Sequence, residues 1–289
     1  MATNPIAILS AGEMGAAIGG ALSTAGIATA TTLLGRGAET TMRAEQAKMQ
    51  ICADLPALAD GCDLFLSVLP PAAATSLAEQ VAAYARTNGK LLTFVEANAI
   101  SPAHTKAIAR LFDGTNVTFI DAGIVGLPPG KSVPRLYVSG PANALLATTN
   151  GIAFDIRDLG PEIGRASGMK MTYAAITKGT NALLAAAFLT AERLDLLDVL
   201  HGELAASQDQ LFNRAVANIP RLPADAARWA PEMLEISQTF RDVGTPDGFH
   251  LAAAEMMDLL AKSQFGEETR RTRDLNRNEI ETIKGLDPS

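Results

Sequence analysis

The chain opens with a short apolar strand that leads through a glycine-containing turn directly into a helix. The strand is predicted over 5–9, the turn reads Ser-Ala-Gly-Glu-Met-Gly over 10–15, and a helix of small residues follows over 16–25. In such a turn one glycine lets the backbone approach a pyrophosphate, another permits close helix–strand packing, and the helix N-terminus stabilises the anion. The stretch predicts a dinucleotide-binding unit whose cofactor contacts are Ala11, Gly12, Glu13, Met14 and Gly15.

The turn departs from the usual pattern at its first position. Ser10 stands where the first of three glycines normally permits the tight turn. A plain strand-to-helix turn without a ligand is the alternative interpretation. The position of the turn, after the first strand and before a helix, favours nucleotide binding.

Strands and helices alternate over the first 160 or so residues, and only helices are predicted afterwards. Further strands are predicted at 31–34, 63–69, 91–95, 117–120, 135–138 and 152–156. Beyond Gly164, helices are predicted at 167–200, 203–218, 224–227, 231–243, 248–262 and 267–284. This pattern predicts an α/β Rossmann-type doubly wound sheet over 1–162, followed by an all-α domain for substrate binding and dimerisation over 163–289.

The end of the second predicted strand bears on the choice of cofactor. An NAD-binding unit usually places an acidic residue there to hold the ribose 2′-hydroxyl, whereas here Gly35-Arg36-Gly37 follows. A guanidinium pairs well with a 2′-phosphate, and Arg43 is a second candidate cation. NADP is therefore favoured over NAD, and an exposed loop arginine is the alternative.

Other candidate ligand contacts follow strands whose carboxyl ends share one edge of the sheet. Leu69 and Pro70 follow the strand 63–69 and are predicted to contact the cofactor. Asn98 follows the strand 91–95 and is predicted to contact both cofactor and substrate. Gly123 begins a predicted glycine- and proline-rich loop, 123–130, and is expected to contact the substrate.

The long helix predicted over 167–200 carries a polar stripe. At ~1.5 Å per residue, a run of some thirty residues is roughly 45 Å long. With about 100° per residue, one side of this helix collects Lys170, Tyr173, Thr177, Lys178 and Asn181. A solvated face would also suit these residues.

Composition and charge exclude several classes of function. A net charge of −7 argues against nucleic-acid binding, and the arginines over 270–277 alternate with acids as on a solvated helix with i,i+4 pairs. Two cysteines and three histidines argue against a metal site and fit reduced thiols in a cytosolic protein. The N-terminus predicts no signal peptide, and the uncharged stretch 14–35 is too rich in small residues for a membrane span.

Taken together, the motifs resemble those of the β-hydroxyacid dehydrogenase superfamily, which includes the 6-phosphogluconate dehydrogenases. They are Gly12-Glu-Met-Gly15, Leu69-Pro70, Ile100-Ser101-Pro102, Asp121-Ala122 with Gly126, and Gly160-Pro161 leading to Lys170. The resemblance covers nearly the whole chain. It implies an NAD(P) domain, a divergent helical C-terminal domain, a catalytic lysine at the Lys170 position, and a homodimer or higher oligomer.

The sequence departs from that family where the family binds hydroxyacids. Tyr173 and Ala174 replace two asparagines, Val125 replaces a serine, and Ala97-Asn98 replaces a Ser/Thr pair. The family's groups bind the substrate carboxylate and hydroxyl. These changes predict a larger, less polar carbonyl or alcohol substrate.

Hydride transfer to a carbonyl needs a proton donor near the oxygen, and a lysine supplies both a proton and a charge. The hypothesis is that Lys170 is the general acid/base and Tyr173 a second donor. Lys178, Asn181 and His250 are then candidates for substrate binding, with capping or core packing the alternative for His250. The rival functions are an imine reductase or reductive aminase, and a non-catalytic NADP-binding protein.

Overall fold

The structure, a computed structural model, describes residues 4–130 and 132–286. The chain forms two compact units, Met1–Lys170 and Met171–Ser289. The units meet within one continuous helix, α7 (Arg165–Arg193), whereas the sequence predicted a boundary between residues 162 and 163.

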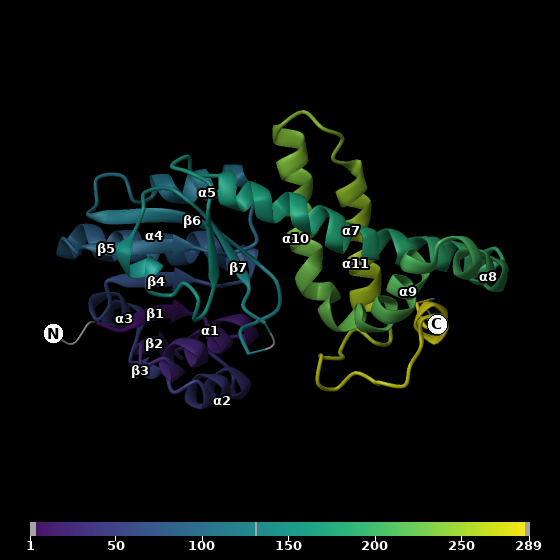
Figure 1. Cartoon of the computed structure of the whole chain (residues 1–289), viewed down its shortest axis with the longest axis horizontal. Coiled ribbons are helices and arrows are strands. Elements are labelled where there is room, and N and C mark those ends of the chain that lie inside the picture. Colours follow the sequence, from purple (N-terminus) through teal and green to yellow (C-terminus); the bar gives the residue numbers. More distant parts are fainter. Residues whose placement is uncertain (1–3, 131, 287–289) are drawn as a thin grey trace. The chain divides into compact units, whose positions relative to one another are not determined.

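The first unit is built on one eight-stranded sheet with the order β3-β2-β1-β4-β5-β6-β7-β8 (Figure 1). Neighbouring strands are parallel except for β6 and β7, which are antiparallel. The strands are β1 (Ile6–Leu9), β2 (Thr29–Thr32), β3 (Gln50–Cys52), β4 (Leu64–Ser67), β5 (Leu92–Glu96), β6 (Val117–Val125), β7 (Arg135–Ser139) and β8 (Asp155–Asp158). The doubly wound sheet predicted from the sequence is confirmed.

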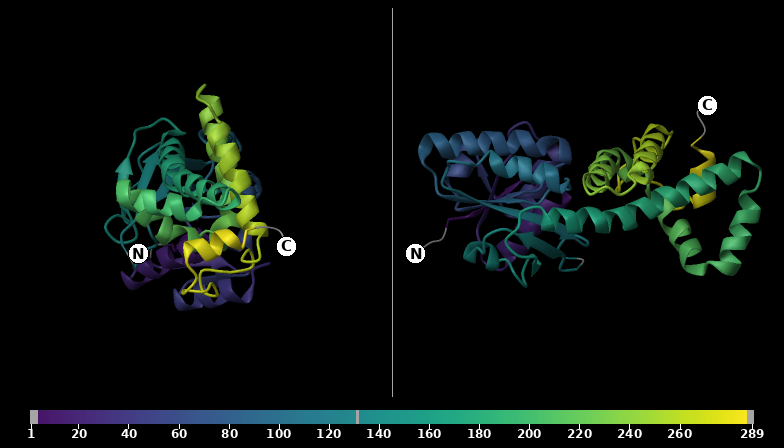
Figure 2. Two further views of the ribbon diagram at one scale, coloured as in Figure 1. Left: turned by 90° about the vertical axis from the view of Figure 1, so that its right-hand side faces the viewer. Right: turned by 90° about the horizontal axis from the view of Figure 1, so that it is seen from above.

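Helices cover both faces of this sheet because its central strands are apolar on both sides. In β1, Ile8 packs with Ile18 of α1, and its neighbour Leu9 packs in a second core with Phe65 and Phe94. Figure 2 (right) shows the long helix α4 lying along one face of the sheet. The helices are α1 (Glu13–Thr24), α2 (Ala38–Gln46), α3 (Leu55–Asp60), α4 (Pro71–Asn88), α5 (Pro102–Arg110) and α6 (Ala144–Ala147).

The second unit is helical, as predicted, and its described residues contain no strand. Helix α7 continues into it and is followed by α8 (Leu197–Ser207), α9 (Asp209–Asn218), a 3₁₀ turn (Ile219–Arg221), α10 (Pro223–Asp242), α11 (Gly248–Lys262) and α12 (Glu279–Lys284). Helices α10 and α11 pack side by side as a hairpin (Figures 1 and 2).

Several helix boundaries predicted from the sequence are wrong. The long helix stops at Arg193 rather than Leu200, because the chain turns through Asp195 with φ 58°. The segment 203–218 belongs to two helices, α8 and α9. The segments 224–227 and 231–243 form the single helix α10, which accommodates Pro231 in its interior.

The predicted charged helix over 267–284 is also wrong, since only its last six residues are helical as α12. Arg277 is buried instead of solvated. Its guanidinium pairs with Glu268, donates to the carbonyl of Pro220 at 3.0 Å, and lies 3.9 Å from the centre of the Phe265 ring. The arginine therefore has a packing role that its alternation with acids did not reveal.

Some strand boundaries also differ from the prediction. Strand β2 ends two residues early, at Thr32, so Arg36 follows it by four residues. Strand β6 continues to Val125, which places Gly123 inside the strand rather than in a loop. Strand β8 begins at Asp155, and the short, largely exposed β3 has no apolar pattern that predicts it.

The carboxylate of Asp121 in β6 joins the sheet to the start of α7. It accepts the backbone N–H groups of Gly164 (2.9 Å), Ala166 (3.1 Å) and Ser167 (3.1 Å). The hydroxyls of Ser139 (2.8 Å) and Ser167 (3.3 Å) also donate to it. Because the first N–H groups of a helix have no partner within the helix, this one buried side chain fixes where α7 begins.

Replacing Asp121 with Ala should destabilise the fold strongly, because buried donors then lose their acceptor. We expect a loss of roughly 3–5 kcal/mol in the free energy of unfolding, measured with urea. Asp158→Ala is the control, since Asp158 accepts one N–H in an exposed turn, from Gly160 at 2.8 Å. A loss for Asp121→Ala no larger than that of the control would contradict this role.

Candidate functional site

The turn between β1 and α1 leaves the start of the helix accessible to a ligand. Gly12 is the N-cap, with φ −67° and ψ −171°, and no side chain caps the helix. A Cβ on Gly15 would lie 1.9 Å from the carbonyl oxygen of Ser10, so this position tolerates only glycine. A Cβ on Gly12 would meet only the Ser10 hydroxyl at 3.6 Å, so the fold does not require glycine there. The space above Gly12 is available to a ligand at the helix N-terminus.

Asn98 joins two more turns at the same edge of the sheet, the one after β4 and the one after β5, through hydrogen bonds. Its side-chain oxygen accepts the backbone N–H of Leu69, and its side-chain nitrogen donates to the Ser67 hydroxyl at 2.8 Å. Asn98 is 3% exposed, so it acts from inside the protein. It sets the position of the half-buried Leu69 and the exposed Pro70, which begin α4.

A pocket of about 260 Å³ lies beside these turns, at the carboxyl ends of β1 and β2. Its polar lining is Thr32, Arg36, Ser76 and Gln80, and its apolar lining includes Leu9, Leu34, Leu55, Leu69 and Leu77. The volume is below the ~300 Å³ at which whole-ligand sites begin, so the pocket suits part of an extended ligand. The prediction identified Arg36 and Leu69 but missed Thr32, Ser76 and Gln80, which lie in helices or strands with no local motif.

The second candidate cation is already engaged. Arg43 pairs with Glu39 at 2.7 Å, one turn away on the same helix, α2. Glu39 therefore offsets the charge of Arg43, and Arg43 is not among the residues that line this pocket, whereas Arg36 is.

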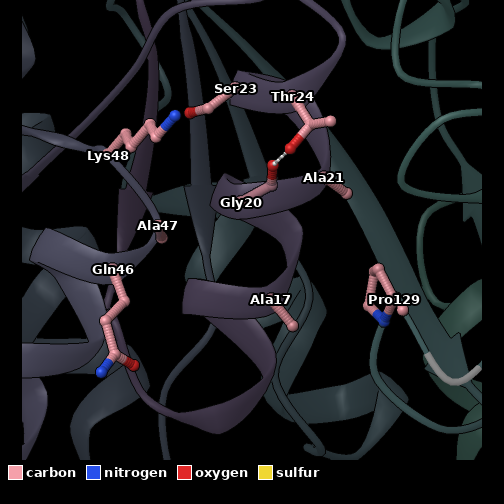
Figure 3. Close-up of a pocket in the computed structure, with 10 residues that line it drawn as sticks. Ala17, Gly20, Ala21, Ser23, Thr24, Gln46, Ala47, Lys48 and Pro129 are labelled. Atoms are coloured by element: carbon pink, nitrogen blue, oxygen red, sulfur yellow. Dashed lines mark hydrogen bonds between the residues drawn. The ribbon is translucent and has the colours of Figure 1, made fainter.

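A different pocket, of about 400 Å³, lies at the opposite end of α1 (Figure 3). Small residues such as Ala17, Gly20 and Ala21 line it, Lys48 extends toward Ser23, and the Thr24 hydroxyl donates to the Gly20 carbonyl at 2.7 Å. The carboxyl end of a helix presents carbonyl groups, which do not favour an anion. This pocket therefore does not suit a pyrophosphate, and no residue predicted for the site lines it.

Gly123 and Lys170 come together in the first unit. The Lys170 ammonium donates to the carbonyl of Ile124 at 2.6 Å, and its side chain is half-buried. A Cβ on Gly123 would lie 2.8 Å from both the Ala166 carbonyl oxygen and the Lys170 Cβ. Glycine at 123 therefore lets the first turns of α7 lie directly on β6, and this close approach brings Lys170 to the carboxyl end of the strand.

The predicted site residues beyond Lys170 belong to the helical unit, where most of them are engaged in its packing. Lys178 forms an ion pair with Glu232, which is 4% exposed, and lies 5.0 Å from the centre of the Trp229 ring. Asn181, 8% exposed, accepts from Arg214 at 3.0 Å. These contacts tie α7 to α10 and α9.

His250 and Tyr173 differ in their surroundings. His250 is buried against α7, with Nε2 3.5 Å from the carbonyl of Ala175, and burial lowers the pKa of its imidazole. Tyr173 is 39% exposed. In the helical unit, the polar stripe predicted along α7 therefore contains the exposed Tyr173 and two residues that contact neighbouring helices, Lys178 and Asn181.

Two buried acids at this edge of the sheet, Glu96 and Asp121, received no role from sequence reasoning, although Asp121 belongs to one of the family motifs. Each is the last or a central residue of an apolar strand, on the same side as Phe94 and Phe119. The period of two along a strand could have placed their side chains in the core. The sequence has no local pattern that identifies the hydrogen-bond donors to these two carboxyl groups.

Residues 5–149 match the NAD binding domain of 6-phosphogluconate dehydrogenase. The chain belongs to that family. Residues 191–260 match a domain of unknown function (DUF1932). The resemblance drawn from the sequence is thereby confirmed, and the family supports a nicotinamide cofactor for the turns described above.

One curated relative and several solved structures are similar to the chain. A Methanothermus fervidus protein, described as an uncharacterized 28.5 kDa protein in the 7S RNA 5′ region, is 26% identical over 63% of this chain and 69% of its own length. A conserved protein of unknown function, described as structurally similar to 3-hydroxyacid dehydrogenases, is 25% identical with a TM-score of 0.64 over 89% of this chain and 96% of its own.

Two enzymes of known activity share the fold. Mycobacterium tuberculosis 3-hydroxyisobutyrate dehydrogenase with L-serine is 18% identical, with a TM-score of 0.65 over 99% of this chain and 100% of its own. The reductive aminase from Aspergillus terreus is 17% identical, with a TM-score of 0.55 over 98% of each chain. That structure is a complex with NADPH4, cyclohexanone and allyl amine.

Within residues 4–130 and 132–286, no three His, Cys, Asp or Glu side chains gather as a metal site requires. No helix formed by the described residues is long and apolar enough to cross a membrane.

The two glycines of the first turn should respond differently to alanine. Gly12→Ala should leave the melting temperature near that of the wild type but weaken NAD(P)H binding by at least about tenfold, because a methyl group then occupies the ligand's approach. Gly15→Ala should lower the melting temperature markedly, since its Cβ would collide with the backbone of Ser10. Thermal unfolding and NAD(P)H fluorescence measure the two effects. Unchanged binding by Gly12→Ala would contradict the assignment of the turn.

Proposed function

We propose that this protein is an NADP(H)-dependent oxidoreductase that interconverts an alcohol and its aldehyde or ketone, with Lys170 as general acid/base. The observation that carries the proposal is the position of Lys170 at the carboxyl end of β6, where the Ile124 carbonyl holds its ammonium at 2.6 Å. The nucleotide turns lie at the same edge of the sheet, since β1, β4, β5 and β6 are parallel. Ligands of such sheets bind outside this edge.

The residues supply the acid–base half of the reaction. A bound nicotinamide provides or accepts the hydride. The Lys170 ammonium donates a proton to the carbonyl oxygen during reduction and its amine removes one from the hydroxyl during oxidation. The Ile124 carbonyl accepts one N–H of the ammonium and orients it at the carboxyl end of β6.

Tyr173 stands one turn beyond Lys170 on α7, and its exposure supports a role as second donor. We infer that Lys178, Asn181 and His250 chiefly hold the helical unit together, since their polar groups contact Glu232, Arg214 and Ala175. The bulkier and less polar substrate expected from the sequence agrees with this, because few free polar groups remain among these residues.

Arg36 supports NADP as the cofactor. It lines the pocket beside the first two strands together with Ser76 and Gln80, and none of the described residues that line this pocket is acidic. A guanidinium and neutral donors suit a 2′-phosphate, whereas a carboxylate would favour the free hydroxyl of NAD.

A reductive aminase or imine reductase is the second candidate, because the Aspergillus reductive aminase complex shares the fold over 98% of this chain. Monitoring NADPH absorbance with a panel of aldehydes, ketones and cyclic imines, with and without amines, separates the two activities. Tight NADPH binding with no turnover of any compound would indicate a non-catalytic NADP-binding protein.

We also propose that the helical unit forms a homodimer. Ile176 and Leu183 are both 69% exposed, and their spacing of seven residues places them on one face of α7. Apolar side chains aligned in this way favour a partner surface. Light scattering tests this, since a dimer has twice the 30.2 kDa mass of the chain. The free thiols of Cys52 and Cys62 support a reducing, cytoplasmic location.

Replacing Lys170 with Ala should abolish turnover while cofactor binding stays within about twofold of the wild type. The loss of a general acid/base lowers kcat by roughly 10²–10⁴-fold. Lys106→Ala is the control, because Lys106 is 46% exposed and its ion pair at 3.7 Å is with an exposed carboxylate, Glu162. Turnover by Lys170→Ala equal to that of the control would refute the mechanism.

Replacing Arg36 with Ala should discriminate between the two cofactors. A charged hydrogen bond to phosphate is worth roughly 1.5–3 kcal/mol, so the Kd for NADPH should rise about 10- to 100-fold. The Kd for NADH should change little. Arg43→Ala should have the smaller effect on NADPH, since Arg43 is paired with Glu39. Equal losses for NADPH and NADH would argue against a 2′-phosphate contact.

A further inference from the structure

A row of buried polar residues crosses the sheet just below the nucleotide turns. Ser67, Glu96, Asp121 and Ser139 occupy matching positions on β4, β5, β6 and β7. Each is at most 1% exposed. Two carboxyl groups therefore lie on neighbouring strands, about 5 Å apart at the backbone, inside the protein. Two like charges on neighbouring strands, both out of water, disfavour each other, so one of the two acids is favoured in its neutral form.

The hydrogen bonds decide which of the two acids keeps its proton. Burial raises the pKa of both acids, but Asp121 accepts from Ser139, Gly164, Ala166 and Ser167, and these donors stabilise its charged form. Glu96 accepts the Asn98 N–H on Oε1 at 2.9 Å, while its buried Oε2 has no hydrogen-bond partner among the described residues. The unpartnered oxygen is the natural position for a proton.

The surroundings of Glu96 agree with a neutral acid. Burial, with a smaller contribution from the charge of Asp121, raises the pKa of Glu96 to about 8. The N–H of Asn98, the hydroxyl of Ser67 on β4 and the imidazole of His104 on α5 act in the opposite direction. These are the groups that face the carboxyl from β4, β6, α5 and the following turn.

We propose that Glu96 is a positioning residue that, as a neutral carboxylic acid, holds Asn98 and the Leu69 turn in the geometry that binds the cofactor. The inference rests on the proposed function, in that the turn binds a nicotinamide nucleotide. Glu96 accepts the backbone N–H of Asn98, the Asn98 side-chain nitrogen donates to Ser67, and the Asn98 side-chain oxygen accepts the N–H of Leu69. Two hydrogen bonds therefore join Glu96 to the turn that leads into α4.

Ionisation of Glu96 would break this arrangement. A buried carboxylate with one unpartnered oxygen attracts donors, and the Ser67 hydroxyl and Asn98 are among the groups that act on it. Their reorientation would release the Leu69 N–H and shift the turn. Because the binding-competent form is the protonated one, affinity is retained below a pH of about 8 and lost above it.

The test compares the Kd for NADPH and NADH between pH 6 and pH 9.5 in the wild type and in Glu96→Gln. If only the protonated form binds, the wild-type Kd rises about tenfold from pH 7 to pH 9. Glu96→Gln keeps the shape without a titrating proton, so it should match the wild type at pH 7 and stay nearly constant. Asp63→Asn is the control and should follow the wild type, because Asp63 is half-exposed before the first residue of β4.

An infrared measurement provides an independent readout without cofactor. The wild type should show the C=O stretch of a protonated carboxyl at pH 7, fading as the pH passes 8, and Glu96→Gln should lack it. The wild-type titration alone tests protonation should the variant fail to fold. Absence of this band overturns the neutral acid.

The remaining outcomes separate the inference from the proposed function. Matching pH profiles of the wild type and Glu96→Gln, or a flat wild-type profile with binding intact, overturn the positioning role. Weakened binding by Glu96→Gln at pH 7 also overturns it. No binding of NADPH or NADH at any pH overturns the proposed function, whatever the infrared band shows.

Discussion

The carboxylate of Asp121 is the interaction on which the rest of the site depends. It lies in the centre of the sheet's longest strand and gathers the first free N–H groups of α7, 43 to 46 residues along the chain. Once the start of α7 is fixed on β6, Lys170 is fixed one and a half turns later. The charge of Asp121 also acts on its neighbour, because one buried anion makes a second one costly. The position of α7 and the protonation of Glu96 therefore both depend on Asp121.

The residues that the sequence revealed are those whose role is local. An apolar run followed by a glycine turn and a helix makes a nucleotide-binding unit wherever it occurs, and Gly12, Gly15 and Leu69 needed no distant partner to be recognised. The change from alternating strands to helices only was equally visible, because each period is a property of a few neighbouring residues.

The residues that the sequence did not reveal depend on partners far along the chain. Lys178 looked available on its helix face, but Glu232, 54 residues away, neutralises it. Gly123 looked like the start of a loop, because a strand that continues through glycine beside α7 has no local pattern. From the sequence, Glu96 is simply the last residue of a strand. Its register with Asp121, which places two acids side by side, is what favours the protonated form of Glu96.

The two glycines of the first turn carry a consequence for recognising related proteins. Gly15 is demanded by the backbone of Ser10, whereas Gly12 has no neighbour in the fold that excludes a side chain. A descendant of this chain that no longer bound a nucleotide would be free to change Gly12 but would have to keep Gly15. Loss of Gly12 beside an intact Gly15 is therefore the signature of a retained fold with an abandoned cofactor.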